Sequence, residues 1–325
     1  MTETRVTTRR RVLGGLAAAA ASWAAPARAG GAVTMIVPAF PSTPAGTVAR
    51  LLAPALGAAL GPTVIADFRP RAGGIVGLME AAHAPADGSV LTLLTPTIVA
   101  APWLASRMDS EPADFAPVGQ VSFIPEVLVV AATSPWRSMT AFLAALRADP
   151  GRVRTAFDGV WDSAEIAEVL MLDRAGLAAR PMPGLRAGPA LAAGRVAFAM
   201  RPLPWAVTRV ARGAVRALAV SAPARARALP GVPTLREAGI DVALGSWLAL
   251  AGPAAAGAAL DPARDALAAA MADPTLSTAL DAAGVPAAYL DTAATGRAIA
   301  AEYRLLGRVF SAAGVNVRRD AMAVR

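Results

Sequence analysis

Cysteine and lysine are absent from the 325-residue sequence, and histidine occurs only once, as His83. The lack of cysteine excludes disulfide bonds and thiolate metal sites, and one histidine leaves little material for an imidazole-based zinc site. Apart from His83, arginine therefore supplies every basic side chain, while aromatic residues make up only 5% of the chain. Because the arginines are scattered and are not interleaved with aromatic residues, the sequence argues against a nucleic-acid-binding protein.

An export signal is expected over residues 1–29. Arg9-Arg10-Arg11 precedes a soft apolar run from Val12 to Ala25, and Ala27-Arg28-Ala29 places small residues where a signal peptidase cleaves. The arginines with Val12-Leu13 resemble the twin-arginine consensus, which predicts a periplasmic protein exported by that route. The apolar run is too short and too weakly hydrophobic for a lasting membrane span, although an uncleaved anchor is the alternative. Without residues 1–29 the chain loses five arginines and one glutamate, so its net charge falls from +8 to +4.

Three segments share the order strand, loop and helix start. In each, an apolar β-branched stretch leads into a loop with glycine, proline or serine, and a helical apolar pattern follows. The segments run from Thr34 to Leu52, from Thr63 to Ala82 and from Val153 to Ala175. In the third, Asp162 or Ser163 is the expected helix N-cap. The free N–H groups at a helix start can bind an anion, but a purely structural turn gives the same pattern.

Strands and helices alternate through the rest of the chain. Further strands are expected at Val90–Leu94, Val127–Ala132, Val196–Met200 and Val215–Ser221. This alternation predicts an α/β protein whose mostly parallel sheets are covered by helices on both faces.

Some polar residues have no clear partner in the sequence. His83 is expected to be a solvated residue at a helix end. The carboxylates of Glu126, Asp158 and Glu165 have no spacing that brings them together, so solvation at the surface is the default expectation for all three.

Five ordered blocks together resemble the periplasmic solute-binding receptors of tripartite tricarboxylate transporters, the TctC or Bug type. The blocks are IVPAFPSTPAGTVARLLAP (Ile36 to Pro54), FRPRAGGIVG (Phe68 to Gly77), DFAPVGQV (Asp114 to Val121), VRALAVSAPARARALPGVPTLREAG (Val215 to Gly239) and SWLAL (Ser246 to Leu250). The resemblance spans nearly the whole chain after the export signal.

The resemblance implies a two-domain Venus-flytrap fold of the periplasmic binding protein type II kind. One domain would comprise residues 30–133 and 249–325, and the other residues 134–248. A small organic anion, a carboxylate, would lie in the cleft between them, held by loop N–H groups, helix starts and water. The expected partners are that anion and the membrane subunits of a tripartite tricarboxylate-type transporter, or a sensor protein. The resemblance further implies a monomer that needs no cofactor and is not an enzyme.

The ligand-binding residues implied by the resemblance come from the matched loops and a few later positions. They are Phe40, Pro41, Ser42, Thr43 and Gly46 in the first loop; Ala72, Gly73, Gly74 and Ile75 in the second; Phe157, Asp158, Gly159, Val160, Trp161 and Ser163 in the third; and Met182, Arg201 and Trp247. Trp161 enlarges a loop that is normally glycine and serine. Trp247 has two open interpretations, because it could line the cleft or fill the crossover between domains.

The chain also departs from the family pattern. In the first loop, Ser42 and Thr43 replace two glycines and Gly46 replaces an aspartate; Ile75 replaces an asparagine, and Arg201 stands where an acid is usual. A lost neutral hydrogen bond is worth about 1 kcal/mol, whereas a unit charge about 4 Å from a carboxylate in a partly screened site is worth roughly 4 kcal/mol. Arg201 is therefore expected either to pair with a ligand carboxylate or to form a surface salt bridge.

Two rival functions remain open. A diverged, ligand-blind member of the family could use its altered loops for protein contacts. An exported enzyme is the other rival, because a twin-arginine signal often accompanies cofactor proteins. The sequence lacks G-x-S-x-G, H-E-x-x-H and a P-loop, which argues against the common hydrolase, metalloprotease and nucleotide-binding sites.

Overall fold

The computed structural model of the protein describes residues 31–105, 108–158 and 162–312. Its strands are β1 Val33–Val37, β2 Val64–Phe68, β3 Val90–Leu94, β4 Phe115–Ala131, β5 Arg154–Thr155, β6 Arg180–Pro181, β7 Phe198–Pro202, β8 Val215–Val220, β9 Gly245–Pro253 and β10 Ala287–Leu290. The helices are α1 Pro44–Leu60, α2 Ile75–Ala82, α3 Thr97–Leu104, α4 Met139–Ala148, α5 Ser163–Ala175, α6 Ala187–Ala192, α7 Leu203–Ala211, α8 Asp261–Ala272, α9 Pro274–Ala282 and α10 Thr292–Ala312. Within the described ranges, no helix is both long and apolar enough to cross a membrane.

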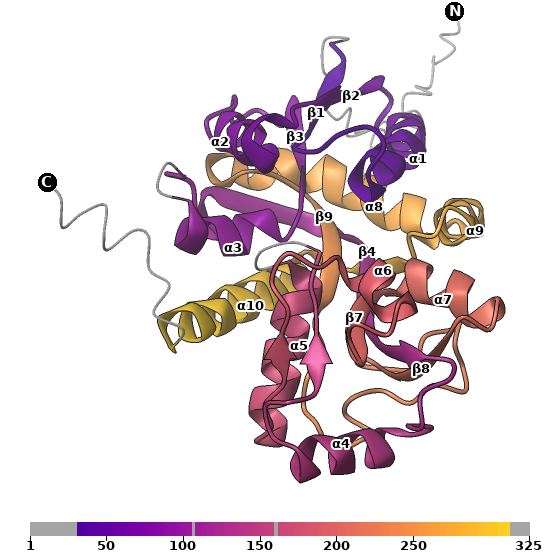
Figure 1. The fold of residues 1–325 in the computed structure, drawn as a ribbon. Helices are drawn as coiled ribbons and strands as arrows, with labels where there is room; N and C mark the ends of the chain where they lie inside the picture. The colour runs from indigo at the N-terminus through magenta and orange to yellow at the C-terminus, as the bar shows by residue number, and fades with distance from the viewer. Residues whose placement is uncertain (1–30, 106–107, 159–161, 313–325) are drawn as a thin grey trace, which may run out of the picture. The chain divides into compact units, whose positions relative to one another are not determined.

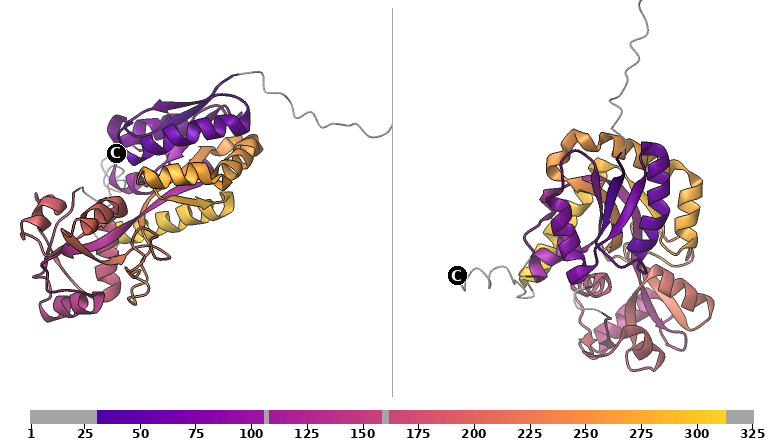
Figure 2. Two further views of the ribbon diagram at one scale, coloured as in Figure 1. Left: turned by 90° about the vertical axis from the view of Figure 1, so that its right-hand side faces the viewer. Right: turned by 90° about the horizontal axis from the view of Figure 1, so that it is seen from above.

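The strands form two lobes that share β4 (Figure 1). In the first lobe the order is β10-β4-β9-β3-β1-β2, whereas β7 and β8 pair with β4 on the second lobe's side. The first lobe also holds α1–α3 and α8–α10, and the second holds α4–α7 with the small β5–β6 sheet. The long strand β4 is visible between the two lobes in the left view of Figure 2.

The sheet of each lobe is covered on both faces, because side chains alternate between the faces of a strand. In β1, Met35 and Val37 pack in the cluster that includes α1, α8 and α9, whereas Ile36 packs on the side of α2, α3 and α10. The helices on either side of β1–β3 are seen from above in the right view of Figure 2. In the second lobe, Val127 and Val129 of β4 face α6 and α7, and the alternate residues face α4 and α5.

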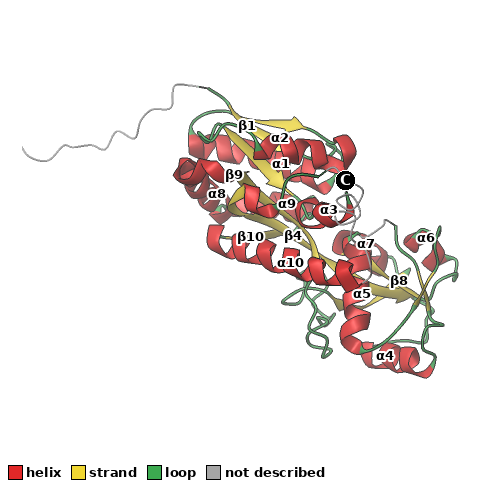
Figure 3. Cartoon of the chain, turned by 90° about the vertical axis from the view of Figure 1, so that its left-hand side faces the viewer, coloured by secondary structure: helices red, strands yellow, loops and turns green. Residues whose placement is uncertain are grey.

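The α/β class follows the sequence prediction, but the sheet is mixed rather than mostly parallel. Strand β1 runs parallel to β2 and β3, whereas β4 runs antiparallel to β7, β8, β9 and β10. The reason is topological: the chain enters the second lobe along β4 and returns along β9, so the two crossing strands point in opposite directions. Figure 3 shows these strands between the helices of both lobes.

Strand β4 is also much longer than the predicted strand Val127–Ala132. It begins at Phe115, and the pairing with β9 is irregular between Pro117 and Gly119 and again between Gln120 and Ser122. Prolines lack the N–H that a regular ladder needs, so Pro117 and Pro125 conceal the first part of the strand in the sequence. Most other predicted elements agree with the structure within a few residues; β3 has the predicted ends, and α2 ends at Ala82, where the second predicted segment ends.

Gly74 is required for the close approach of the first two loops. A Cβ at Gly74 would lie 2.1 Å from the carbonyl oxygen of Pro38, and its φ is +94°. Gly73 has φ +68°, but a Cβ there would meet nothing within 4 Å. Gly73 and Gly74 therefore both have a left-handed backbone, but only at Gly74 would an added Cβ collide with Pro38.

We expect Gly73→Ala to destabilise the protein by about 1–2 kcal/mol, the cost of a left-handed non-glycine residue. Gly74→Ala is expected to cost about 1–3 kcal/mol more, because the added methyl group must displace the Pro38 backbone. Urea denaturation of both variants at neutral pH measures the difference. An equal loss of stability in the two variants would show that the contact with Pro38 is not tight.

Candidate functional site

The first loop is tied together by its own residues. Thr43 caps α1, because its Oγ1 accepts a hydrogen bond from the N–H of Gly46 at 3.3 Å and donates to the carbonyl of Phe40 at 2.7 Å. Arg50 donates to the carbonyl of Pro41 at 2.6 Å. A Cβ at Gly46 would lie 2.3 Å from that same carbonyl oxygen, so an aspartate would not fit here without a change of the loop. The side chain of Phe40 is 60% exposed.

The second loop turns through three consecutive residues with positive φ. These are Ala72 (φ 51°), Gly73 and Gly74, and they deliver the chain to the first residue of α2, Ile75. A non-glycine residue in the left-handed region is uncommon, so Ala72 is held there by the loop around it. The loop and the start of α2 lie against Pro38 of the first loop. Two of the three predicted loops are therefore in direct contact.

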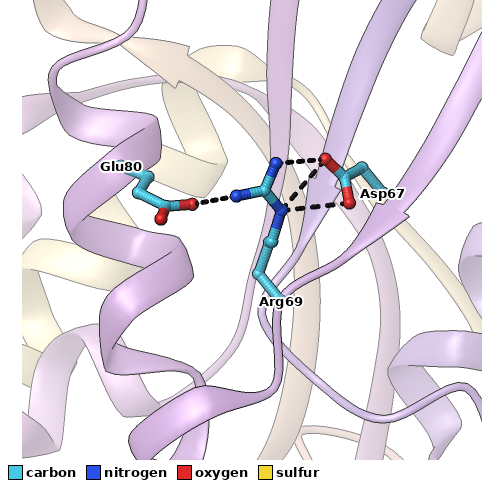
Figure 4. A network of polar contacts seen from close by, with 3 residues as sticks. All are labelled: Asp67, Arg69 and Glu80. Carbon is cyan, nitrogen blue, oxygen red and sulfur yellow. Dashed lines mark hydrogen bonds and ion pairs between the residues drawn. The ribbon is translucent and has the colours of Figure 1, made fainter.

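Arg69 fixes the beginning of the second loop (Figure 4). Its guanidinium donates to both oxygens of Asp67 at 2.6–3.0 Å and to Oε2 of Glu80 on α2 at 2.7 Å. Its backbone N–H donates to the carbonyl of Val37 at 2.8 Å. The hydrogen bonds from Arg69 lower the pKa of Asp67. These side chains are substantially exposed, so solvent weakens each ion pair, and the network mainly orients the loop.

A cavity of about 420 Å³ lies where the two lobes meet, and we call it the interlobe cavity. The starts of three helices line it: Ile75 opens α2, Thr97 opens α3 and Ser163 opens α5. Within the described residues, no side chain caps α2 or α3, whose N-caps are Gly74 and Pro96. The first N–H groups of a helix lack partners inside it, and the helix dipole adds to their attraction for an anion.

Two carboxyl groups also line the cavity: Glu302, and Asp162, whose Oδ1 accepts the hydrogen bond of the Glu165 N–H at the start of α5. The attraction for a small anion therefore comes from the starts of α2 and α3, which no described side chain caps.

Several polar residues of this cavity were missed by sequence reasoning. They are Thr95, Thr97, Ser246 and Glu302. The segment Thr95-Pro96-Thr97 directly follows β3, at the carboxyl end of the parallel strands, where the loops after β1 and β2 also lie. Ligands often bind at this end of a parallel sheet, so the position of the segment could have identified it as part of the site. Ser246 and Glu302 come from far along the chain, so no local pattern points to them.

Phe157, Asp158 and Met182 line a second cavity, of about 470 Å³, within the second lobe. Asp158 also pairs with Arg201 and accepts a hydrogen bond at 2.8 Å from the N–H of Ala187. The guanidinium carbon of Arg201 lies 4.9 Å from the centre of the Trp205 ring. The side chain of Arg201 is only 11% exposed, so this arginine is in a salt bridge but is not a surface residue. Gly159, Val160 and Trp161 lie outside the described residues.

Glu126 contradicts the default expectation of a solvated carboxylate. Its side chain is fully buried, and Ser163 Oγ lies 2.7 Å from its Oε1. Burial raises the pKa of Glu126 to about 7, and the negative charge of Asp162 adds to this, while Ser163 and Arg201 act in the opposite direction. The sequence offered no sign of burial, because Glu126 follows a proline within a strand whose first part was not recognised. Glu165 is half-buried at the start of α5.

Trp247 lies on β9 beside Phe123 of β4, at the crossover between the lobes. Its Nε1 donates to Oε2 of Glu302 on α10 at 2.7 Å, and burial raises the pKa of Glu302 to about 7. Trp247 lines a third, mainly apolar cavity of about 460 Å³, and Glu302 lines both this cavity and the interlobe cavity. Trp247 therefore lies at the crossover between the lobes and also lines a cavity there.

The structure thus distributes the predicted residues over several places. Ile75 and Ser163 meet at the interlobe cavity, and Phe157, Asp158 and Met182 meet in the second lobe, where Arg201 is bound to Asp158. The residues from Phe40 to Thr43 form the turn before α1, and Gly46 lies in the first turn of that helix. His83 is exposed at the end of α2, as expected, with its Nδ1 2.9 Å from the carbonyl of Met79.

Comparison with known proteins identifies the family of the chain. The sequence model of the family described as "Tripartite tricarboxylate transporter family receptor" matches residues 48–315. Protein BugT of Bordetella pertussis (strain Tohama I) is 33% identical over 247 residues, which cover 74% of this chain and 74% of BugT.

Solved structures agree with this assignment. A TctC solute binding protein from Polaromonas superposes with a TM-score of 0.80 at 23% identity, covering 86% of this chain and 98% of that one. Rpa4515 of R. palustris with adipate has a TM-score of 0.68 at 25% identity, covering 87% and 97%. These likenesses confirm the two-domain binding-protein fold expected from the sequence. The chain belongs to the tripartite tricarboxylate transporter receptor family.

Proposed function

We propose that the protein is exported to the periplasm, where it captures a small organic carboxylate in the interlobe cavity. The observation that carries the proposal is the meeting of three helix starts, those of α2, α3 and α5, at one cavity formed by both lobes. Adipate in the related Rpa4515 structure supports a carboxylate as the ligand class. The lobes correspond, in this proposal, to domains of residues 30–133 with 249–325 and residues 134–248.

Capture would work through the two crossing strands. A ligand that contacts both lobes binds a closed arrangement, with the lobes close together, more tightly than an open one. The ratio of these two affinities sets how far the ligand shifts the population toward the closed arrangement. The loaded monomer would then deliver the ligand to membrane subunits of a tripartite tricarboxylate-type transporter or to a sensor. The arginines near the start of the sequence support export by the twin-arginine route.

The proposal predicts thermal stabilisation by carboxylates. A panel of di- and tricarboxylates, amino acids and aromatic acids, including adipate, is expected to contain at least one compound that raises the melting temperature, because a ligand that binds only the folded state stabilises it. Ile75→Trp should abolish the shift by filling the interlobe cavity. Ile65→Trp, at a side chain on β2 that is 51% exposed, is the matched control and should keep it. No shift with any compound would favour the ligand-blind alternative.

Arg201 is proposed to favour an anionic ligand through its charge. We expect Arg201→Ala to weaken binding of the best carboxylate at least tenfold, because it removes the positive charge and leaves Asp158 unpaired. Arg209→Ala is the control, since Arg209 also lies over the Trp205 ring, at 4.1 Å. Isothermal titration calorimetry measures both affinities. If Arg201→Ala binds as tightly as the unmodified protein, Arg201 has no part in ligand choice.

A further inference from the structure

Glu126 lies where β4 passes from one lobe to the other. Residues of β4 up to Pro125 pair with β9, and from Glu126 onward β4 pairs with β7 and β8. Ser221, directly after β8, holds this point: its hydroxyl lies 2.9 Å from the backbone nitrogen of Glu126, and its own N–H donates to the Glu126 carbonyl at 2.8 Å. The backbone of Glu126 is therefore fixed, and its side chain has one defined environment.

The side chain of Glu126 reaches the interlobe cavity only through Ser163. Glu126 is fully buried, whereas Ser163 is half-buried and lines the cavity. Oε1 of Glu126 is 2.7 Å from Ser163 Oγ, and Oε2 is buried with no hydrogen-bond partner in the described structure. The serine hydroxyl thus stands between the buried carboxyl group and any ligand in the cavity.

The charged groups around Glu126 do not neutralise an ionised carboxylate. Asp162, on the α5 side, is negative and opposes ionisation, while Arg201, on β7, favours it. Arg201 is already paired with Asp158, and the chain after β8 contributes the uncharged hydroxyl of Ser221. A buried carboxyl group without its own cation favours the neutral form. Burial accordingly raises the pKa of Glu126 to about 7.

The protonation state of Glu126 decides which way its hydrogen bond with Ser163 runs. An ionised carboxylate only accepts, so the proton of Ser163 must point to Glu126 and away from the cavity. A neutral carboxyl group has one O–H, which is best placed on Oε1, because Oε2 has no acceptor nearby. That O–H donates to Ser163 Oγ, and the proton of Ser163 is then free to point into the cavity.

We infer that Glu126 is a positioning residue for the ligand: when it is protonated, it turns the Ser163 hydroxyl into a hydrogen-bond donor for a carboxylate in the interlobe cavity. This inference rests on the proposed function. It makes carboxylate binding depend on a proton that the protein itself holds. When Glu126 is ionised, the proton of Ser163 is directed at its carboxylate, so the serine hydroxyl can only accept a hydrogen bond from the ligand side. A carboxylate ligand then loses this donor and is repelled by the negative charge of Glu126.

The inference predicts affinity that falls as pH rises. With a pKa of about 7, the protonated fraction of Glu126 drops about tenfold between pH 6 and pH 8, so adipate should bind about tenfold more weakly at pH 8. The carboxyl groups of adipate are mostly ionised over this range and contribute little to the change. Calorimetric titration with adipate at pH 6, 7 and 8 gives the profile; if adipate does not bind, the best dicarboxylate of the panel replaces it.

Variants separate this role from a structural one. Glu302 lines the same cavity and also has a pKa raised to about 7 by burial, so the reference protein and every variant are titrated in the Glu302→Gln background. In that background Glu126→Gln cannot ionise, and its amide can donate to Ser163, so binding should keep its pH 6 strength up to pH 8. Ser163→Ala should bind more weakly at pH 6 and show a smaller pH dependence, because the donor is lost while the charge of Glu126 still titrates. Glu168→Gln is the matched control, since Glu168 is also buried on α5 but bonds to Thr155. This control should retain the tenfold pH dependence of the reference protein.

Thermal melting without ligand tests the titration itself. A carboxyl group whose pKa is higher in the folded than in the unfolded state stabilises the fold below its unfolded pKa and loses that contribution as pH rises through the folded pKa. The melting temperature of Glu126→Gln should therefore be close to that of the unmodified protein at pH 4, below the ordinary pKa of 4.5, and exceed it at pH 8. This measurement also verifies that the variant folds.

The titrations distinguish failure of this inference from failure of the proposed function. Binding of a carboxylate with no pH dependence, or with the same dependence in Glu126→Gln, would refute the role of Glu126 and leave the proposed function intact. No binding of any carboxylate to the unmodified protein at any of the three pH values would refute the proposed function and this inference together. A tenfold pH dependence that is lost in Glu126→Gln and kept in Glu168→Gln supports the inference.

Discussion

Strand β4 (Phe115–Ala131) is the element on which the rest of the structure depends. Its first part pairs with β9 and β10, and its last part pairs with β7 and β8. In the described structure, β4 is the strand with which both β7 and β8 of the second lobe pair. Val220 of β8 makes one further isolated bridge, to Thr234. Strand β4 is buried on both faces in both lobes. Its apolar side chains pack against helices of the first lobe in its first part and against helices of the second lobe in its last part.

This arrangement places polar groups at the junction of the lobes, where burial has the greatest effect on them. Glu126 on β4 and Glu302 on α10 both have a pKa raised to about 7 by burial, and each is bonded to one side chain, Ser163 or Trp247. Buried carboxyl groups without a cation reduce stability when they ionise, so their presence at the junction has a cost. In our account, Glu126 offsets that cost by orienting the donor that a ligand needs.

Much of this fold could be predicted from the sequence, since β3 has the predicted ends, α2 ends at the predicted Ala82, and Asp162 is the N-cap of α5, as one of the two expected alternatives. The first part of β4 could not, because prolines and register shifts hide its alternation. Of the site, Ile75 and Ser163 were predicted at loop ends and do meet at one cavity. Ser246 and Glu302 join them only through the return of β9 and the packing of α10, which are long-range contacts that no local pattern encodes.

The central claim is that an organic carboxylate binds between the lobes, at the starts of α2, α3 and α5. A crystal structure with the tightest carboxylate of a screening panel tests it most directly. The account predicts that the ligand carboxylate lies within hydrogen-bond distance of backbone N–H groups at those helix starts and of the Ser163 hydroxyl. A ligand bound instead in the apolar cavity beside Trp247, or only on the surface of one lobe, would contradict it.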